Sequence, residues 1–140
     1  MTAELPLLLD TCAAIWISEE HPLAGEALTA IERNHGHGRF IYVSPITAWE
    51  IGLLMSRGKL TSPISPQRWF ARLLEAPGLR LADLSADVLI ASSFLPGAPP
   101  RDPADRILAA TAREYGYRLV TRDAPLLTYA RHGHLQALPC

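Results

Sequence analysis

Four acidic residues have the side chains with the clearest capacity for chemistry in this sequence: Asp10, Glu50, Asp105 and Asp123. Carboxylates that share one cleft repel one another, and hard oxygen ligands of this kind suit Mg²⁺ or Mn²⁺. One or two such ions lower the pKa of a bound water and neutralise charge on a scissile phosphate. If the fold gathers these four acids, the sequence predicts a metal site that hydrolyses phosphodiester bonds.

Each aspartate also has an ordinary structural explanation. Asp10 and Asp123 precede predicted helices and can act as N-caps, and Asp105 lies in a first helical turn, where negative charge meets the helix dipole. We interpret Asp102, directly before Pro103, as the cap of that same helix. Taken one at a time, these residues favour the structural interpretation, and only the four acids together indicate a metal site.

Glu50 is harder to explain as a structural residue. The surrounding segment Ile46–Met55 is apolar almost all round, which predicts a buried helix. A buried carboxylate costs free energy unless a partner compensates its charge. Arg57 is about two helical turns away, so it offers no ion pair on the same face. A cation shared with the other acids would supply the missing compensation.

Alternating strands and helices must position these acids. The apolar pattern predicts strands over residues 5–9, 40–43, 79–81 and 118–121, with a further edge strand at 135–138. It predicts helices after Thr11 as far as His21, over 24–34, 45–56, 67–75, 85–93 and 103–115, and after Asp123, with a loop at 35–38. This order indicates an α/β fold: a three-layer α/β/α sandwich with a central, mainly parallel sheet of four to five strands, as a single domain over residues 1–140.

The predicted sheet places three of the acids at one rim. Ligands of open α/β sheets gather at the carboxyl ends of the strands, where the strand order switches direction. Asp10 directly follows the first strand, and Asp123 follows the strand that ends at Thr121. Asp105 opens the helix that leads into that strand. If the strands are parallel, these side chains share one edge of the sheet.

Three further residues are candidates for supporting roles. The Thr121 hydroxyl could bond a carboxylate or a water, and Arg106 and Arg122, which flank two of the acids, could hold substrate phosphates. An ordinary strand position explains Thr121 equally well, and solvated surface positions are the simpler explanation of both arginines. Lys59 is the single lysine among 13 basic residues. The arginine excess suits phosphate binding, and a coding bias explains it equally well.

Composition and charge limit the class of protein. The chain is 49% hydrophobic and 19% charged, as is typical of a soluble globular protein. A net charge of −1 argues against a broad basic DNA-binding surface but permits RNA binding at one site. Cys12 and Cys140 have no paired spacing, and no apolar run approaches a signal peptide or a membrane span, so we expect a reduced, cytoplasmic protein without a membrane contact. The pairs His35–His37 and His132–His134 are interpreted as surface residues.

Four stretches, in the right order along nearly the whole chain, resemble the PIN-domain family and, within it, the VapC-type toxins of bacterial toxin–antitoxin systems. They are Leu7–Thr11, Val43–Leu60, Asp102–Ala112 and Leu119–Asp123. The resemblance maps the acidic quartet of the family onto Asp10, Glu50, Asp105 and Asp123. It implies a Mg²⁺- or Mn²⁺-dependent endoribonuclease that acts on tRNA or ribosomal RNA, forms a homodimer and is inhibited by a cognate antitoxin protein.

Other classes remain as alternatives. A haloacid-dehalogenase-type phosphatase needs a second aspartate at the position of Cys12, and a receiver domain needs a late lysine, so both are disfavoured. The stronger alternative is a non-catalytic PIN-fold binding partner that acts through dimerisation or through a regulatory complex with its antitoxin on DNA. The simplest alternative is an α/β domain whose acids are only helix caps, and Glu50 argues against it.

Overall fold

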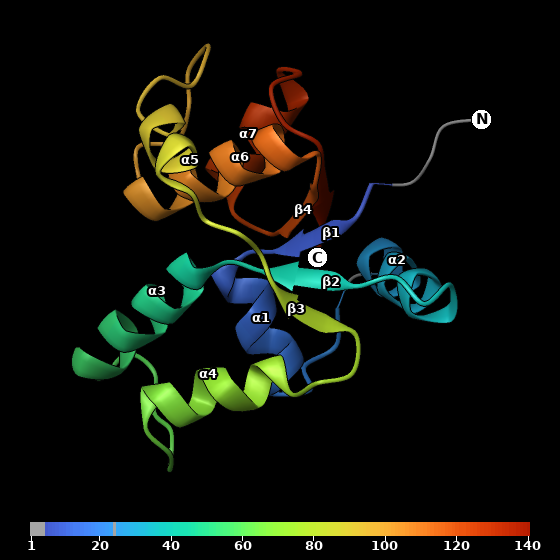
Figure 1. Cartoon of the computed structure of the whole chain (residues 1–140), viewed down its shortest axis with the longest axis vertical. Helices are drawn as coiled ribbons and strands as arrows, with labels where there is room; N and C mark the ends of the chain where they lie inside the picture. The colour runs from blue at the N-terminus through green and yellow to red at the C-terminus, as the bar shows by residue number, and fades with distance from the viewer. Residues whose placement is uncertain (1–4, 24) are drawn as a thin grey trace.

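A sheet of five parallel strands forms the centre of the computed structural model, which describes residues 5–23 and 25–140 (Figure 1). The strands are β1 (Leu7–Leu9), β2 (Ile41–Val43), β3 (Leu79–Leu81), β4 (Arg118–Thr121) and β5 (Ala137–Pro139). Their order is β3-β2-β1-β4-β5, and each neighbouring pair is parallel. The strand order therefore switches direction between β1 and β4, at the centre of the sheet.

Helices cover both faces of this sheet (Figure 1). They are α1 (Thr11–Ser18), α2 (Gly25–Gly36), α3 (Pro45–Ser56), α4 (Pro66–Leu74), α5 (Ala86–Ala91), α6 (Pro103–Tyr115) and α7 (Ala124–Arg131). α1, α2 and α4 contribute to the core on one face, whereas α6 and α7 pack on the other face with α5 beside α6. The predicted three-layer α/β/α sandwich is confirmed. No helix in the described residues is both long and apolar enough to cross a membrane.

The central strand β1 has the sequence expected for a position between two layers. Leu7 and Leu9 pack into the core on the side of α1 and α2, whereas Leu8 packs into the core on the side of α6 and α7. All three side chains are buried. Because a central strand of a parallel sheet faces apolar layers on both sides, its sequence is continuously apolar rather than alternating.

Local signals in the sequence fix the start and end of the helices around the site. Ser44 caps α3 by accepting a hydrogen bond from the backbone N–H of Ile46 at 3.1 Å, and Pro45 occupies the first turn, as predicted. Gly116 ends α6 in the left-handed conformation, with φ at 72°, which glycine adopts without strain. These ends set where α3 and α6 begin and stop relative to the strands.

Two expectations for the helices were wrong in part. α2 continues through Gly36, so the predicted loop begins later and His35 lies in the last helical turn; Ala24, the predicted start, lies outside the described residues. α3 is not buried all round, because only Thr47 and Ile51 are buried and Trp49 is 53% exposed. α3 packs against α1, α4 and α6, which leaves the side that carries Trp49 uncovered in the chain.

Candidate active site

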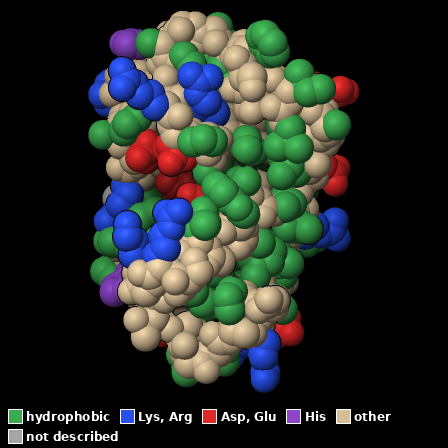
Figure 2. All heavy atoms as spheres, turned by 90° about the vertical axis from the view of Figure 1, so that its left-hand side faces the viewer, with side chains coloured by type: hydrophobic (Ala, Val, Ile, Leu, Met, Phe, Trp, Pro, Cys, Tyr) green, Lys and Arg blue, Asp and Glu red, His purple; other side chains and the backbone are tan. Residues whose placement is uncertain are grey.

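The four predicted acids line one pocket of about 440 Å³. It lies at the carboxyl ends of β1 and β4, where the strand order switches, and its lining is Asp10, Thr11, Cys12, Ile15, Glu50, Leu54, Asp102, Asp105, Arg122 and Asp123. Figure 2 shows acidic side chains gathered between two groups of basic side chains on the face that includes α3. The structure therefore brings together acids from four separate parts of the sequence.

Asp10 is both a helix cap and a lining residue of the pocket. One carboxylate oxygen, Oδ1, accepts a hydrogen bond from the Ala13 backbone N–H at 2.7 Å and so caps α1. The other oxygen, Oδ2, accepts from the Thr121 hydroxyl at 2.6 Å. The side chain is only 4% exposed. The capping role predicted for Asp10 is therefore compatible with a place in the site.

Thr121 joins the ends of the two central strands. Its hydroxyl donates to Asp10 and accepts a hydrogen bond from the backbone N–H of Asp123 at 3.0 Å. Asp123 in turn caps α7, because its Oδ2 accepts from the Leu126 backbone N–H at 3.0 Å. The fully buried threonine thus fixes two acids relative to each other, as the sequence had suggested it could.

Glu50 is held by a residue that sequence reasoning did not assign to the site. The buried Thr11 hydroxyl donates to Oε1 of Glu50, and it lies 3.1 Å from the Thr47 hydroxyl. Thr11 begins α1, whereas Thr47 and Glu50 lie on α3. The only signal in the sequence was a polar residue directly after Asp10, and its partner depends on how the two helices meet.

Asp102 and Asp105 lie together at the start of α6. Asp102 caps the helix as predicted, since its Oδ1 accepts from the Asp105 backbone N–H at 3.0 Å. Its exposed side chain also contributes to the pocket. Burial, followed by the negative charges of Asp123, Asp102, Glu50 and Asp10, raises the pKa of Asp105 to about 7. Asp105 is therefore the acid on which the crowding of carboxylates acts most clearly.

Asp10 and Glu50 respond to the same two causes. Burial raises the pKa of Asp10, against the hydrogen bonds from Thr121 and Ala13 that favour the carboxylate. Burial also raises the pKa of Glu50, against the hydrogen bond from Thr11, and neighbouring aspartates add to the rise. Negative charge in this pocket is thus costly, and a cation among the acids would lower that cost.

Comparisons with known proteins decide the family. The PIN domain family model matches residues 7–131 of the chain. This chain belongs to the PIN-domain family. The family predicted from the sequence motifs is thereby confirmed. The chain is also 35% identical over 127 residues to ribonuclease VapC22 of Mycobacterium tuberculosis, an alignment that covers 90% of this chain and 92% of that protein.

Solved structures share the fold of this PIN domain at low sequence identity. VapBC2 from Rickettsia felis, bound to a DNA fragment from its promoter, matches with a TM-score of 0.67 and 18% identity over 96% of this chain and 98% of that chain. FitAcB from Neisseria gonorrhoeae matches with a TM-score of 0.51 and 20% identity over 94% of this chain and 96% of that chain. At these identities the likeness shows the fold alone.

The donor set of this PIN domain fits a hard divalent cation. In the described part of the chain, no three His, Cys, Asp or Glu side chains are already closed around one point as a metal cage. Mg²⁺ does not need such a cage, because it usually keeps several waters and binds through one or two carboxylates plus substrate phosphates. An open pocket lined by five carboxylates offers oxygen donors of the right kind.

The two predicted supporting arginines occupy different surroundings. Arg122 lines the acid pocket. Arg106 does not, and its Nη1 donates towards the carbonyl oxygen of Ser92 at 3.5 Å. No histidine lines the pocket either, and the His134 ring packs on Tyr129 with 5.0 Å between centroids. Only Arg122 of the two is therefore placed to meet a ligand beside the acids.

Proposed function

We propose that this PIN domain is a divalent-metal-dependent endoribonuclease, a VapC-type toxin that hydrolyses phosphodiester bonds of tRNA or ribosomal RNA in the cytoplasm. The observation that carries this proposal is the single pocket lined by Asp10, Glu50, Asp105 and Asp123. The relative that is 35% identical over most of both chains is named a ribonuclease, which supports the same chemistry.

The roles of the residues follow from their positions. Asp10, Asp105 and Asp123 would hold Mg²⁺ or Mn²⁺ directly or through water, and Glu50 would hold a second ion or orient the attacking water. When bound, such an ion supplies Lewis-acid stabilisation of the scissile phosphate and lowers the pKa of water. Thr121 keeps Asp10 and Asp123 in register, and Thr11 keeps the Glu50 carboxylate pointing towards the other acids.

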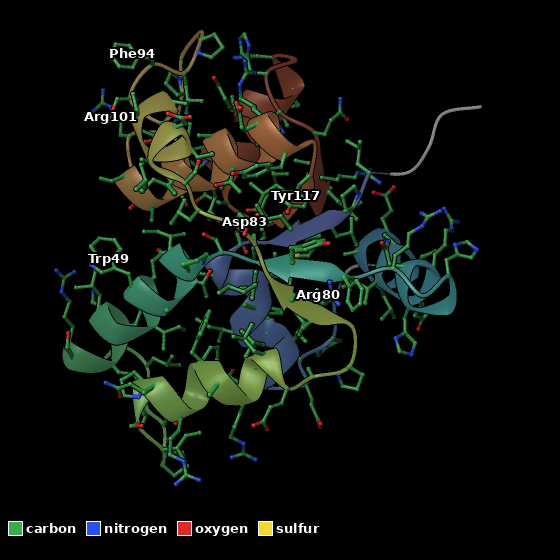
Figure 3. The ribbon with its side chains drawn as sticks, viewed as in Figure 1. Trp49, Arg80, Asp83, Phe94, Arg101 and Tyr117 are labelled. Atoms are coloured by element: carbon green, nitrogen blue, oxygen red, sulfur yellow. The ribbon has the colours of Figure 1, made fainter. Side chains whose placement is uncertain are left out.

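The proposed partners are a cognate antitoxin protein and a second copy of the chain. The family resemblance in the sequence supports the antitoxin, and the R. felis and N. gonorrhoeae neighbours are described as the assemblies VapBC2 and FitAcB. The homodimer is supported by large apolar side chains that remain exposed on α3 and just after α5. Trp49 and Phe94 both point outward on the same side of the molecule (Figure 3), and Phe94 is 80% exposed.

Cleavage of RNA by pure protein tests this function. We would incubate antitoxin-free protein with total bacterial RNA and Mg²⁺ or Mn²⁺, and map the new RNA ends. EDTA and the Asp10→Asn variant should both abolish the cuts. Asp87→Asn is the matched control, because Asp87 is an exposed first-turn aspartate of α5 outside the pocket, and it should cut as the wild type does.

Each outcome has a definite meaning. Discrete cuts that vanish with EDTA and with Asp10→Asn would establish the nuclease and identify its RNA. Absence of cleavage with either metal, from folded and antitoxin-free protein, would contradict the proposed activity. The fold would stand, and the non-catalytic binding partner would become the better account.

A further inference from the structure

Arg122 carries the one positive charge among the described residues that line the acid pocket. Its guanidinium carbon lies 3.4 Å from the centroid of the Trp16 ring, which is the distance of a close cation–π contact. Its Nη2 also donates a hydrogen bond to the backbone carbonyl oxygen of Cys140 at 3.0 Å. The Trp16 ring on one face and the Cys140 backbone oxygen at one edge therefore fix the orientation of this guanidinium.

None of the acids in the pocket lies within ion-pair distance of Arg122. Among the described residues, no carboxylate oxygen lies within 4.0 Å of an Arg122 side-chain nitrogen. Arg122 is nevertheless exposed, and its guanidinium has five N–H donors, of which the Cys140 carbonyl occupies one. The pocket therefore presents a charged, oriented group whose remaining donors face no carboxylate at ion-pair distance.

A phosphodiester that enters this pocket meets five carboxylates. It needs positive charge beyond a metal ion to offset their repulsion, and the planar guanidinium matches two phosphate oxygens at once. A side chain already held in place loses less conformational freedom on binding than a mobile one. The contact with Trp16 thus holds the Arg122 guanidinium in one orientation before an anion binds.

We propose that Arg122 binds a phosphate of the RNA that enters the acid pocket, and that Trp16 is the positioning residue that holds Arg122 for this contact. This inference rests on the proposed ribonuclease function. It separates Arg122 from Arg106, which donates to a backbone carbonyl away from the pocket lining.

The chain contains a matched control for the cation–π contact. The Arg80 guanidinium, on β3 (Figure 3), lies 3.7 Å from the centroid of the Phe40 ring. Neither residue lines the acid pocket. Phe40→Leu and Arg80→Gln therefore remove the same kind of contact without touching the site.

Binding of RNA, measured apart from cleavage, tests the inference. The probe is a fluorescein-labelled pool of short single-stranded RNA of random sequence, since phosphate contacts carry no sequence information. Anisotropy titrations in Mg²⁺ at several salt concentrations would use the Asp10→Asn background to prevent cleavage. Arg122→Gln should raise Kd about tenfold and reduce the salt slope by about 0.7, the loss of one contact to a single-strand phosphate.

Trp16→Leu should raise Kd about threefold with a smaller change in salt slope, because the charge remains but its orientation is lost. Trp16→Phe, which keeps an aromatic face, should restore most of the affinity, and it keeps the test valid if the leucine variant fails to fold. Arg122→Lys should keep the salt slope but not the full affinity. In the cleavage-competent background, Arg122→Gln and Trp16→Leu should raise KM more than they lower kcat.

Three results would overturn the inference. If Arg122→Gln binds RNA as Arg80→Gln does, with an unchanged salt slope, Arg122 has only a structural role. If Trp16→Leu binds RNA as tightly as Phe40→Leu does, while Arg122→Gln binds RNA weakly, Trp16 does not position the arginine. If the Asp10→Asn protein binds no RNA and the wild type cleaves none, the proposed function itself fails, and the inference fails with it.

Discussion

Asp105 has the carboxyl group whose ionisation most opposes folding in the absence of metal. Its pKa in the folded chain is raised from 3.8 to about 7, first by burial and then by four neighbouring acids. In the unfolded chain the same group ionises near its ordinary value. The folded state therefore binds more protons between about pH 4 and pH 7, so stability falls as the pH rises through this window. A proton and a metal ion also compete for this carboxylate below about pH 7.

We predict that Asp105→Asn raises the melting temperature of the metal-free protein at about pH 8, because it removes a carboxylate that the fold disfavours. The gain should shrink as the pH falls from about 7 and disappear only below the ordinary pKa of 3.8, where the group is protonated in both the folded and the unfolded state. Thermal melts in EDTA across this range measure the effect. A variant that is less stable than the wild type at pH 8 in EDTA would show that the ionised Asp105 carboxylate does not destabilise the fold through its burial and its acidic neighbours.

At the scale of elements, the meeting of α1 and α3 sets the direction of Glu50. The contact consists of the Thr11 hydroxyl, the Thr47 hydroxyl and the Glu50 carboxylate. Without the Thr11 donor, the half-buried carboxylate of Glu50 would lose the hydrogen bond that favours its charged form. The packing of α1 against α3 therefore determines how the Glu50 carboxylate is oriented in the proposed active site.

Thr11→Val should lower kcat/KM for RNA by about 10–100-fold, the usual effect of removing a group that orients a metal-site ligand. Thr111→Val is the control, because Thr111 is also buried, on α6, and its hydroxyl donates only to the Ile107 carbonyl oxygen at 2.7 Å. Both variants should be compared by steady-state kinetics and by thermal melts. Equal loss of activity in the two would mean that packing, not orientation of Glu50, explains the result.

The elements also show what the sequence could predict. The continuously apolar run before Asp10 and the Ser44-Pro45 and Asp102-Pro103 starts are local signals, and the strands and helix starts they predict are observed. The placement of Asp10, Asp105 and Asp123 at one edge of the sheet could be predicted on the condition that the strands are parallel, and the strands are parallel. The contacts of Thr11 with Glu50 and of Trp16 with Arg122 were not predicted, because they depend on how distant elements pack. An apolar helix pattern likewise did not reveal that α3 leaves Trp49 exposed.

At the scale of the whole molecule, the exposed apolar side chains beside the site are the main support for the proposed homodimer. Trp49 on α3 and Phe94 just after α5 lie on the same side of the molecule (Figure 3). The helix α5 lies on that side too (Figure 1), and its Ile90 is 61% exposed. Contiguous exposed apolar patches on a protein surface often mark sites where another protein chain binds. The chain should therefore associate through this side.

Light scattering should give twice the 15.3 kDa chain mass for the wild type and the single-chain mass for Ile90→Glu. Ile90 is mostly exposed, so the substitution should not destabilise the fold of the single chain. The melting temperature of the variant should therefore fall only by the amount that loss of the dimer contact itself causes. Leu28→Glu is the control, because Leu28 is 45% exposed on α2, and it should remain dimeric. A monomeric wild type at micromolar concentration would contradict the dimer.

The strand order has a consequence for the timing of the activity during protein synthesis. Asp10 and Thr121 are 111 positions apart, yet their side chains are joined by a hydrogen bond. β1 leaves the ribosome early and must wait for β4 to pair beside it. A nascent chain that stops before Thr121 lacks Asp123 and also the hydroxyl that joins Asp123 to Asp10. Products that are truncated before Thr121 would therefore carry no complete site, so the proposed toxin would become active only after β4 has been synthesised.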